Sequence, residues 1–220
     1  ANNNTALGHL TLSANTTGDL NTAVGAGALD ANTTASNATA VGYGALGSNT
    51  TGVLNTAVGT GALDANTTGG NNSAVGVNAL GANTTSDNNS AFGSTALSNN
   101  TTGSANTAIG SLSLRDNTTG SNNTAIGADA LLVNTTGTSN TVVGLNCGED
   151  NVSGNNNTAM GVNCFRHNTS GDQNTAIGRD CLEENTADNN TAVGFATLQK
   201  NTTGTENVAV GAFALDANTT

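Results

Sequence analysis

The chain has 220 residues, and its composition is unlike that of an ordinary globular enzyme. Asn and Thr each occur 38 times, Pro and Trp are absent, and charged residues make up only 9% of the chain, against about 25% in typical soluble domains. Four basic and 15 acidic residues leave a net charge of -11. This balance argues against a nucleic-acid partner or an anionic membrane surface, because both need basic patches. No apolar run approaches the roughly 18 residues of a membrane span, so we expect none.

A short repeat runs along the whole chain. The segment NTAVG at residues 21–25 recurs, and its glycine falls at positions 8, 25, 42, 59, 76, 93, 110, 127, 144, 161, 178, 194 and 211. Successive positions differ by 17, except Gly178 and Gly194, which differ by 16. We call this residue the marker glycine and count positions in each copy from it. The consensus reads N-T-A-V-G-x-x-A-L-x-x-N-T-T-G-x-x.

Two apolar columns stay in phase through all copies, which argues against disorder. Position −1 is always apolar, and position +4 is Leu except at Gly148 and Phe165. The first strand of each copy is expected at N-T-A-V-G and the second at roughly A-L-x-x-N, with T-T-G-x-x as the long turn and two residues after the marker glycine as the short one. The pattern predicts an all-β chain, a single parallel β-solenoid of 13 coils over residues 1–220, with coils stacked about 4.8 Å apart.

Alternation along a strand predicts which columns face inward. We expect the Val and Leu columns to fill the interior of the coil and the Ala columns to form a second dry face that meets sister chains. The alternative is that the small Ala residues line an exposed sheet. The predicted core ladder includes Val24, Leu29, Val41, Leu46, Val58, Leu63, Val75 and Leu80.

A column of Asn residues lies at position +7, and nearly all of its members begin an Asn-x-Ser/Thr sequon. Stacked side-chain amides can bond from coil to coil, as Asn ladders do in cross-β stacks. The same sequons make the column a candidate for a stripe of covalent glycans, linked to Asn or to Thr. The members with a sequon are Asn15, Asn32, Asn49, Asn66, Asn83, Asn100, Asn117, Asn134, Asn151, Asn168, Asn201 and Asn218.

Three cysteines occupy one column at position +3 in successive coils: Cys147, Cys164 and Cys181. Elsewhere this column is mostly Ala, so we interpret the cysteines as small buried residues. A spacing of about 4.8 Å is near disulfide range, but the odd number leaves one thiol over.

The repeat predicts no catalytic, cofactor-binding or metal-binding residue. His9 and His167 share no column, and no nucleophile–base set, carboxylate pocket or phosphate loop is present. All four basic residues lie in the second half, which also holds the one shortened coil and Gly148. This less regular half is where we expect specific contacts.

The two ends keep the phase of the repeat, since joining the last residue to the first would place Gly211 and Gly8 one full repeat apart. Neither end carries an evident cap, and an open β edge templates further pairing. The pattern therefore favours either head-to-tail stacking of chains or a segment of a longer fibre.

The NTAVG-x-x-A unit resembles the SVAIG-type repeat in the heads of YadA-like trimeric autotransporter adhesins and related tail-fibre repeats of phages and large viruses. The resemblance covers the whole chain, although the NTTG-type turn makes its coil longer than the family's. It implies a left-handed β-roll, three chains around an axis and an adhesive or spacer role outside a cell. It brings no catalytic residues.

These observations predict a non-enzymatic extracellular or cell-surface filament or adhesive fibre, which self-associates and meets a host or matrix surface. A phage or viral tail-fibre shaft for receptor attachment is the alternative. Ice binding is a weaker one, because the two Thr residues after the ladder Asn are adjacent and must face apart.

Overall fold

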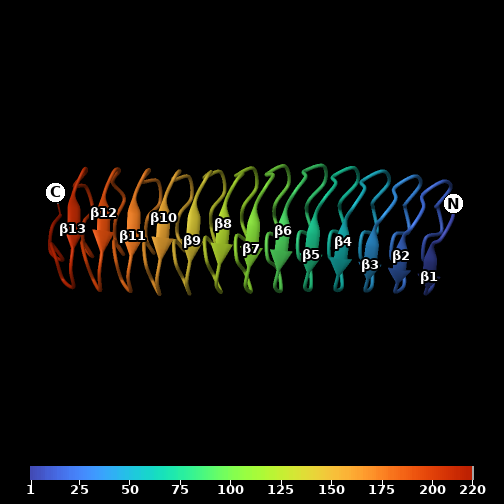
Figure 1. Cartoon of the computed structure of the whole chain (residues 1–220), viewed down its shortest axis with the longest axis horizontal. Coiled ribbons are helices and arrows are strands. Elements are labelled where there is room, and N and C mark those ends of the chain that lie inside the picture. The colour runs from blue at the N-terminus through green and yellow to red at the C-terminus, as the bar shows by residue number, and fades with distance from the viewer. Residues whose placement is uncertain (220) are drawn as a thin grey trace.

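The computed structural model describes residues 1–219 and shows a parallel β-solenoid (Figure 1). Thirteen three-residue strands form one sheet in chain order, and each strand pairs in parallel with the next. The described residues include no helix long and apolar enough to cross a membrane. The strands are β1 (Thr5–Leu7), β2 (Thr22–Val24), β3 (Thr39–Val41), β4 (Thr56–Val58), β5 (Ser73–Val75), β6 (Ser90–Phe92), β7 (Thr107–Ile109), β8 (Thr124–Ile126), β9 (Thr141–Val143), β10 (Thr158–Met160), β11 (Thr175–Ile177), β12 (Thr191–Val193) and β13 (Val208–Val210).

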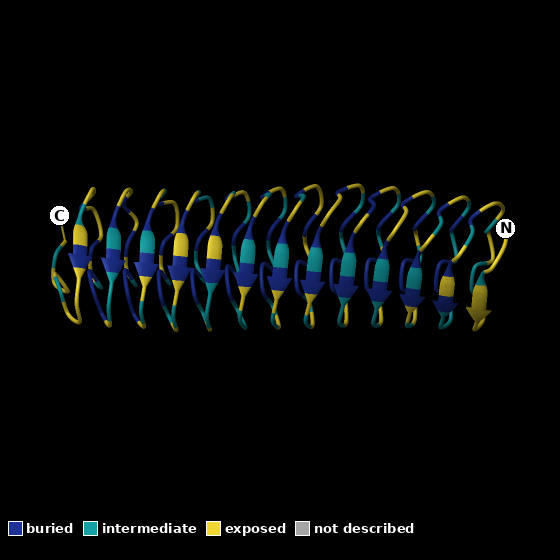
Figure 2. Cartoon of the chain, in the orientation of Figure 1, coloured by how far each residue is buried: buried dark blue, intermediate teal, exposed yellow. Residues whose placement is uncertain are grey.

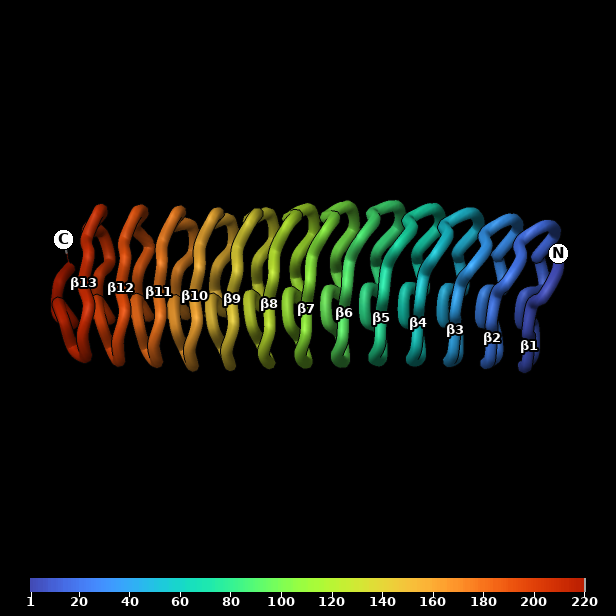
Figure 3. The backbone as a smooth tube through the Cα atoms, viewed as in Figure 1, coloured from blue at the N-terminus to red at the C-terminus, as the bar shows by residue number. Residues whose placement is uncertain are grey.

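The coils repeat with the same register from end to end, so that equivalent residues lie in columns along a rod (Figure 3). Thr39, Ala40 and Val41 of β3 pair with the equivalent Thr, Ala and Val of β4. The register holds across the shortened coil, since β11 pairs with β12 without a shift. The missing residue is removed from the long turn, where Asn185 Nδ2 donates to Ala187 O, two residues on, whereas its counterpart Asn168 donates to Gly171 O, three residues on.

The marker glycine is required by both its backbone angle and its packing. Gly42 has a φ of +137°, and a Cβ atom there would lie 2.5 Å from the carbonyl oxygen of Gly59 in the next coil. Any side chain would therefore push neighbouring coils apart at a φ that L-residues rarely adopt. This double constraint explains why the column is glycine in every copy.

The predicted Val half of the core ladder is wrong, because the two strand columns face the other way. The middle Ala of each strand is buried, as at Ala40 and Ala57, whereas Val41 is 36% exposed and Val24, Val58 and Val75 are half-buried. Figure 2 shows this as dark-blue segments within most of the strands. The interior is narrow, so it takes the small side chain of the strand and leaves the larger one outside. The Ala columns therefore form no second outer face.

The predicted second strand is also absent, although its Leu residues are buried as expected. The A-L segment is a turn in which Leu29, Leu46, Leu63 and Leu80 have φ between +52° and +53°. In a strand, adjacent residues point to opposite faces. The left-handed conformation instead lets Ala28 and Leu29 both point inward with no exposure. Each such non-glycine residue carries strain of roughly 1–2 kcal/mol, which complete burial of the Leu side chain offsets.

Exceptions in the core compensate one another. In the coil of β9, the Leu position is Gly148 and the strand's middle Ala position is Val142, which is fully buried. A Cβ on Gly148 would lie 3.5 Å from Val142 Cγ1. The larger strand residue thus fills part of the space that the missing Leu leaves.

Candidate functional surfaces

The Asn column at position +7 is a buried hydrogen-bonded ladder. Asn66 Nδ2 donates to Asn49 Oδ1 at 2.8 Å and to Gly69 O at 2.9 Å, while its own Oδ1 accepts from Asn83 Nδ2 at 3.0 Å. All three Asn side chains are fully buried. The ladder thus satisfies the carbonyl groups of the long turn, which is a structural reason for the abundance of Asn.

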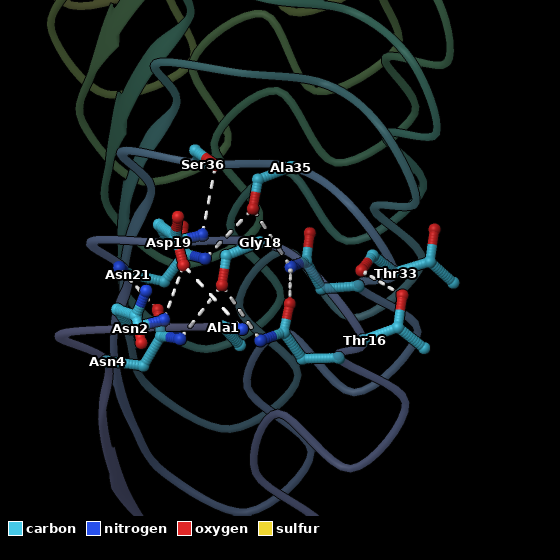
Figure 4. Close-up of polar contacts among 12 residues, drawn as sticks. Ala1, Asn2, Asn4, Thr16, Gly18, Asp19, Asn21, Thr33, Ala35 and Ser36 are labelled. Atoms are coloured by element: carbon cyan, nitrogen blue, oxygen red, sulfur yellow. Dashed lines mark hydrogen bonds and ion pairs between the residues drawn. The ribbon is translucent and has the colours of Figure 1, made fainter.

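A second Asn column, at position −4, runs beside the first. Asn4 Nδ2 donates to Gly18 O, and Asn21 Nδ2 donates to Ala35 O, each at 2.9 Å (Figure 4). The side-chain oxygen of Asn21 accepts from the backbone N–H of the next coil at Ala38, the one position where the column lacks Asn. Two ladders therefore tie each turn to its neighbours.

Glycosylation of the ladder amides conflicts with this geometry. Ten of the twelve sequon Asn side chains, from Asn32 to Asn201, have no exposed surface, and only Asn15 and Asn218 are half-buried. At Asn66 both amide hydrogens are already donated. An attached sugar would break these bonds and would have no space, so the folded rod leaves no N-linked stripe on the buried members.

The two Thr residues that follow the ladder Asn differ in environment, as their adjacency predicts. Thr50 is half-buried and its hydroxyl donates to Thr67 O at 3.0 Å. Thr51 is exposed, and so are its equivalents in most coils. The exposed column at position +9 therefore presents hydroxyl groups to solvent along the long turn.

The cysteine column is buried and reduced, in line with the interpretation of the cysteines as replacements for Ala. Cys147, Cys164 and Cys181 have no exposed surface and form no disulfide. Cys164 Sγ donates to Ala176 O at 3.2 Å. Hydrogen bonding to the neighbouring thiol, together with burial, raises the pKa of Cys164 and of Cys181 well above the usual range. These thiols therefore stay protonated and unreactive in the folded rod.

Charged side chains of the second half connect neighbouring coils. Arg166 Nε lies 2.7 Å from Glu149 Oε2, and His167 Nδ1 lies 2.6 Å from Asp150 Oδ2. Within one coil, Arg115 donates to Asp116 and lowers the pKa of that carboxyl. No group of three or more His, Cys, Asp or Glu side chains within residues 1–219 is placed to hold a metal ion. His9 and His167 lie far apart along the rod.

A hollow that sequence reasoning missed lies along the short turns of the first coils. It has a volume of about 570 Å³, and the exposed Tyr43 and the carboxyl of Asp64 line it. Position +2 is glycine in three successive coils, at Gly27, Gly44 and Gly61, so no side chain fills the floor. Burial raises the pKa of Asp64. The run of three glycines in one column is the signal that could have revealed it.

The second missed feature is the outer face of the sheet, which we define as positions −3, −1 and +1 of all coils. Fourteen of the 21 large hydrophobic side chains that are exposed among the described residues lie in these three columns. None of the 15 acidic residues occupies them, and Arg179 is their one Lys or Arg. The outer face thus lacks carboxylates and carries a column at position −1 that is apolar in every coil, beside a column at position −3 that is Thr or Ser in 12 of the 13 coils.

In comparisons with known proteins, no family model, curated protein or solved structure matches the chain. The resemblance to YadA-like head repeats therefore stays a prediction, and so do the handedness and the three-chain arrangement that it implies.

Proposed function

We propose that the chain is a non-enzymatic structural rod, a shaft of an extracellular or cell-surface filament or adhesive fibre. The observation that supports this proposal is the uninterrupted register of 13 parallel strands, with the same pairing from β1 to β13. Each coil adds one strand to the sheet and one residue to each Asn ladder. Coils can therefore be added without any change in the coils already present. Function then resides in length, stiffness and a repetitive surface rather than in one site.

Any glycan coat of this fibre would attach through Thr rather than through the buried ladder Asn. The exposed Thr column at position +9 projects from the long turn, away from the interior. Sugars there would thicken the polar surface and leave both Asn ladders intact.

Electron microscopy of the native assembly tests the proposal. Thirteen coils at about 4.8 Å give roughly 62 Å per chain. We expect unbranched rods much longer than this single-chain length, of constant width. If the native material consists only of particles of single-chain length at all concentrations, the filament proposal is wrong.

A further inference from the structure

We propose that the outer face of the sheet binds a second copy of this chain side by side, so that the rods associate laterally. This inference goes beyond growth along the axis, because rods that never lengthen could still pair in this way. It also replaces the Ala columns as the contact between chains, since those columns are buried inside each coil.

The first argument is the apolar character of the face. Position −1 exposes Phe92 (42%), Ile109 (41%), Ile126 (37%) and Met160 (51%), and position +1 adds Tyr43 (70%). The largest exposed patch on a typical monomer is a few hundred Å², and larger ones mark interaction sites. The position −1 column, which is apolar in all 13 coils, is therefore expected to be covered.

The second argument is charge, which selects where two copies can meet. The chain carries a net charge of -11, and all of its acidic residues lie outside the outer face. Copies that approach through the turns bring carboxylates together, which is unfavourable. The one Lys or Arg on the outer face is Arg179, whose charge is paired with the neighbouring Asp180 at 3.1 Å and which lies over the Phe195 ring.

The third argument is spacing, which identifies the partner as the same chain. In-register strands place the exposed side chains in rows about 4.8 Å apart along the rod. Ridges formed by these rows interdigitate over the full length only with a surface of the same period. A second copy has that period by construction, whereas a globular partner does not.

The area is sufficient for a stable contact. Twelve steps between 13 strands give a length of roughly 58 Å, and four residue steps from position −3 to position +1 give a width of roughly 13 Å. One face thus offers on the order of 750 Å², and two faces together bury on the order of 1,500 Å². Stable interfaces bury about 1,200–2,000 Å².

At one end of the face, Phe195 at position +1 packs against Phe213, which lies beside the face at position +2. Phe195 and Phe213 pack edge to face with ring centroids 5.0 Å apart. Both remain exposed, at 41% and 57%. Aromatic side chains are enriched in protein interfaces, so these two rings are expected to be covered when two rods associate.

The test compares two double variants with the same change in charge. Ile109→Lys with Ile126→Lys places two ammonium groups on the outer face, whereas Thr102→Lys with Thr119→Lys places them on the exposed long turn. In sedimentation equilibrium, we expect the unmodified chain and the turn variant at twice 21.4 kDa or a higher multiple. We expect the face variant at no more than half of the mass of the turn variant, because growth along the axis does not use the outer face.

Two controls separate this result from misfolding and from growth along the axis. Ile109→Thr with Ile126→Thr keeps the β-branched shape, so it must retain the circular dichroism spectrum of the unmodified chain while its dissociation constant rises at least tenfold. Mass per length by scanning transmission electron microscopy must be at least twice about 0.35 kDa per Å, the value for a single rod of 21.4 kDa.

Three outcomes would overturn the lateral contact. Long rods with a mass per length of about 0.35 kDa per Å would refute it and leave the filament proposal intact. Equal dissociation of the face and turn variants would show that the contact lies elsewhere. A chain that stays single and produces thermal hysteresis would assign the outer face to ice instead.

Discussion

Replacing Asn66 with alanine removes one rung of the position +7 ladder in the middle of the first half. The side chain is fully buried and makes three hydrogen bonds. Its loss leaves Asn49 Oδ1 without the donor that Asn66 supplies. Gly69 O keeps a second donor in Asn55 Nδ2 at 2.7 Å, and Asn83 Nδ2 keeps its bond to Ser86 O at 3.1 Å.

The magnitude follows from this count. One orphaned buried acceptor costs about 1–3 kcal/mol, and each of the two remaining lost bonds contributes about 0.5–1.5 kcal/mol. We therefore expect Asn66→Ala to lower the free energy of unfolding by about 2–6 kcal/mol. In a chain of this size that corresponds to a fall in Tm of roughly 4–24 °C.

Urea unfolding followed by circular dichroism measures the change, with Thr68→Ala as the matched control. Thr68 lies two residues further along the same turn and is exposed, so its replacement is expected to change stability by less than about 0.5 kcal/mol. Similar midpoints for the two variants would refute the view that the amide ladder stabilises the rod.

Three further predictions concern the backbone, the core and the thiols. Gly110→Ala should destabilise the fold by more than about 4 kcal/mol, because the φ of Gly110 is +137° and a Cβ there would overlap the carbonyl group of Gly127. Gly27→Ala should cost only about 1–2 kcal/mol, because the φ of Gly27 is +70° and no atom lies nearer than 4.0 Å to the added Cβ. Equal urea midpoints for the two variants would contradict this reasoning. Leu97→Ala, at a fully buried position, should cost about 2–5 kcal/mol of stability, whereas Val58→Ala on the outer face should cost less than about 1.5 kcal/mol in dilute solution. If thermal unfolding shows the reverse order, the Val column belongs to the core after all. Because the pKa values of Cys164 and Cys181 are raised in the folded state, these thiols keep protons that the unfolded chain releases above about pH 8.5, and the free energy of unfolding should fall by about 3 kcal/mol between pH 7.5 and 9.5. A variant with all three cysteines replaced by Ala should lack this fall. Parallel pH profiles of the two proteins would contradict the assignment of the fall to the thiols.

The fold class could be predicted from the sequence because a strict period forces equivalent side chains into columns. The assignment of the columns to faces could not, because it depends on backbone angles. Strand alternation applies to Thr-Ala-Val, but hydrophobicity alone ranks Val41 above Ala40 as a core residue. The narrow interior reverses that order.

The turn around Leu29 shows the second limit. No rule of sequence reading places a run of Leu residues at φ near +52°, since such residues rarely adopt it. The conformation is stable here because most coils bury the side chain that adopts it, as at Leu29 and Leu97. The stacked Asn ladder could be predicted from the repeat. The complete burial of ten of its sequon members, which conflicts with N-linked glycans, could not be predicted, because it depends on how the long turn folds over them.

The direction of the hydrogen bonds has a mechanical consequence for a rod under tension. The bonds between coils, such as that from Leu46 N to Ala62 O, join each coil to the next along the stack. A pull on the two ends therefore loads the coils in series and peels them from an end one at a time. Each released coil extends to roughly 58 Å at about 3.4 Å per residue, against a folded rise of about 4.8 Å. The rod would lengthen about twelvefold in discrete steps, and each step would dissipate part of the load. A fibre of already extended chains would instead transmit the load through its covalent backbone.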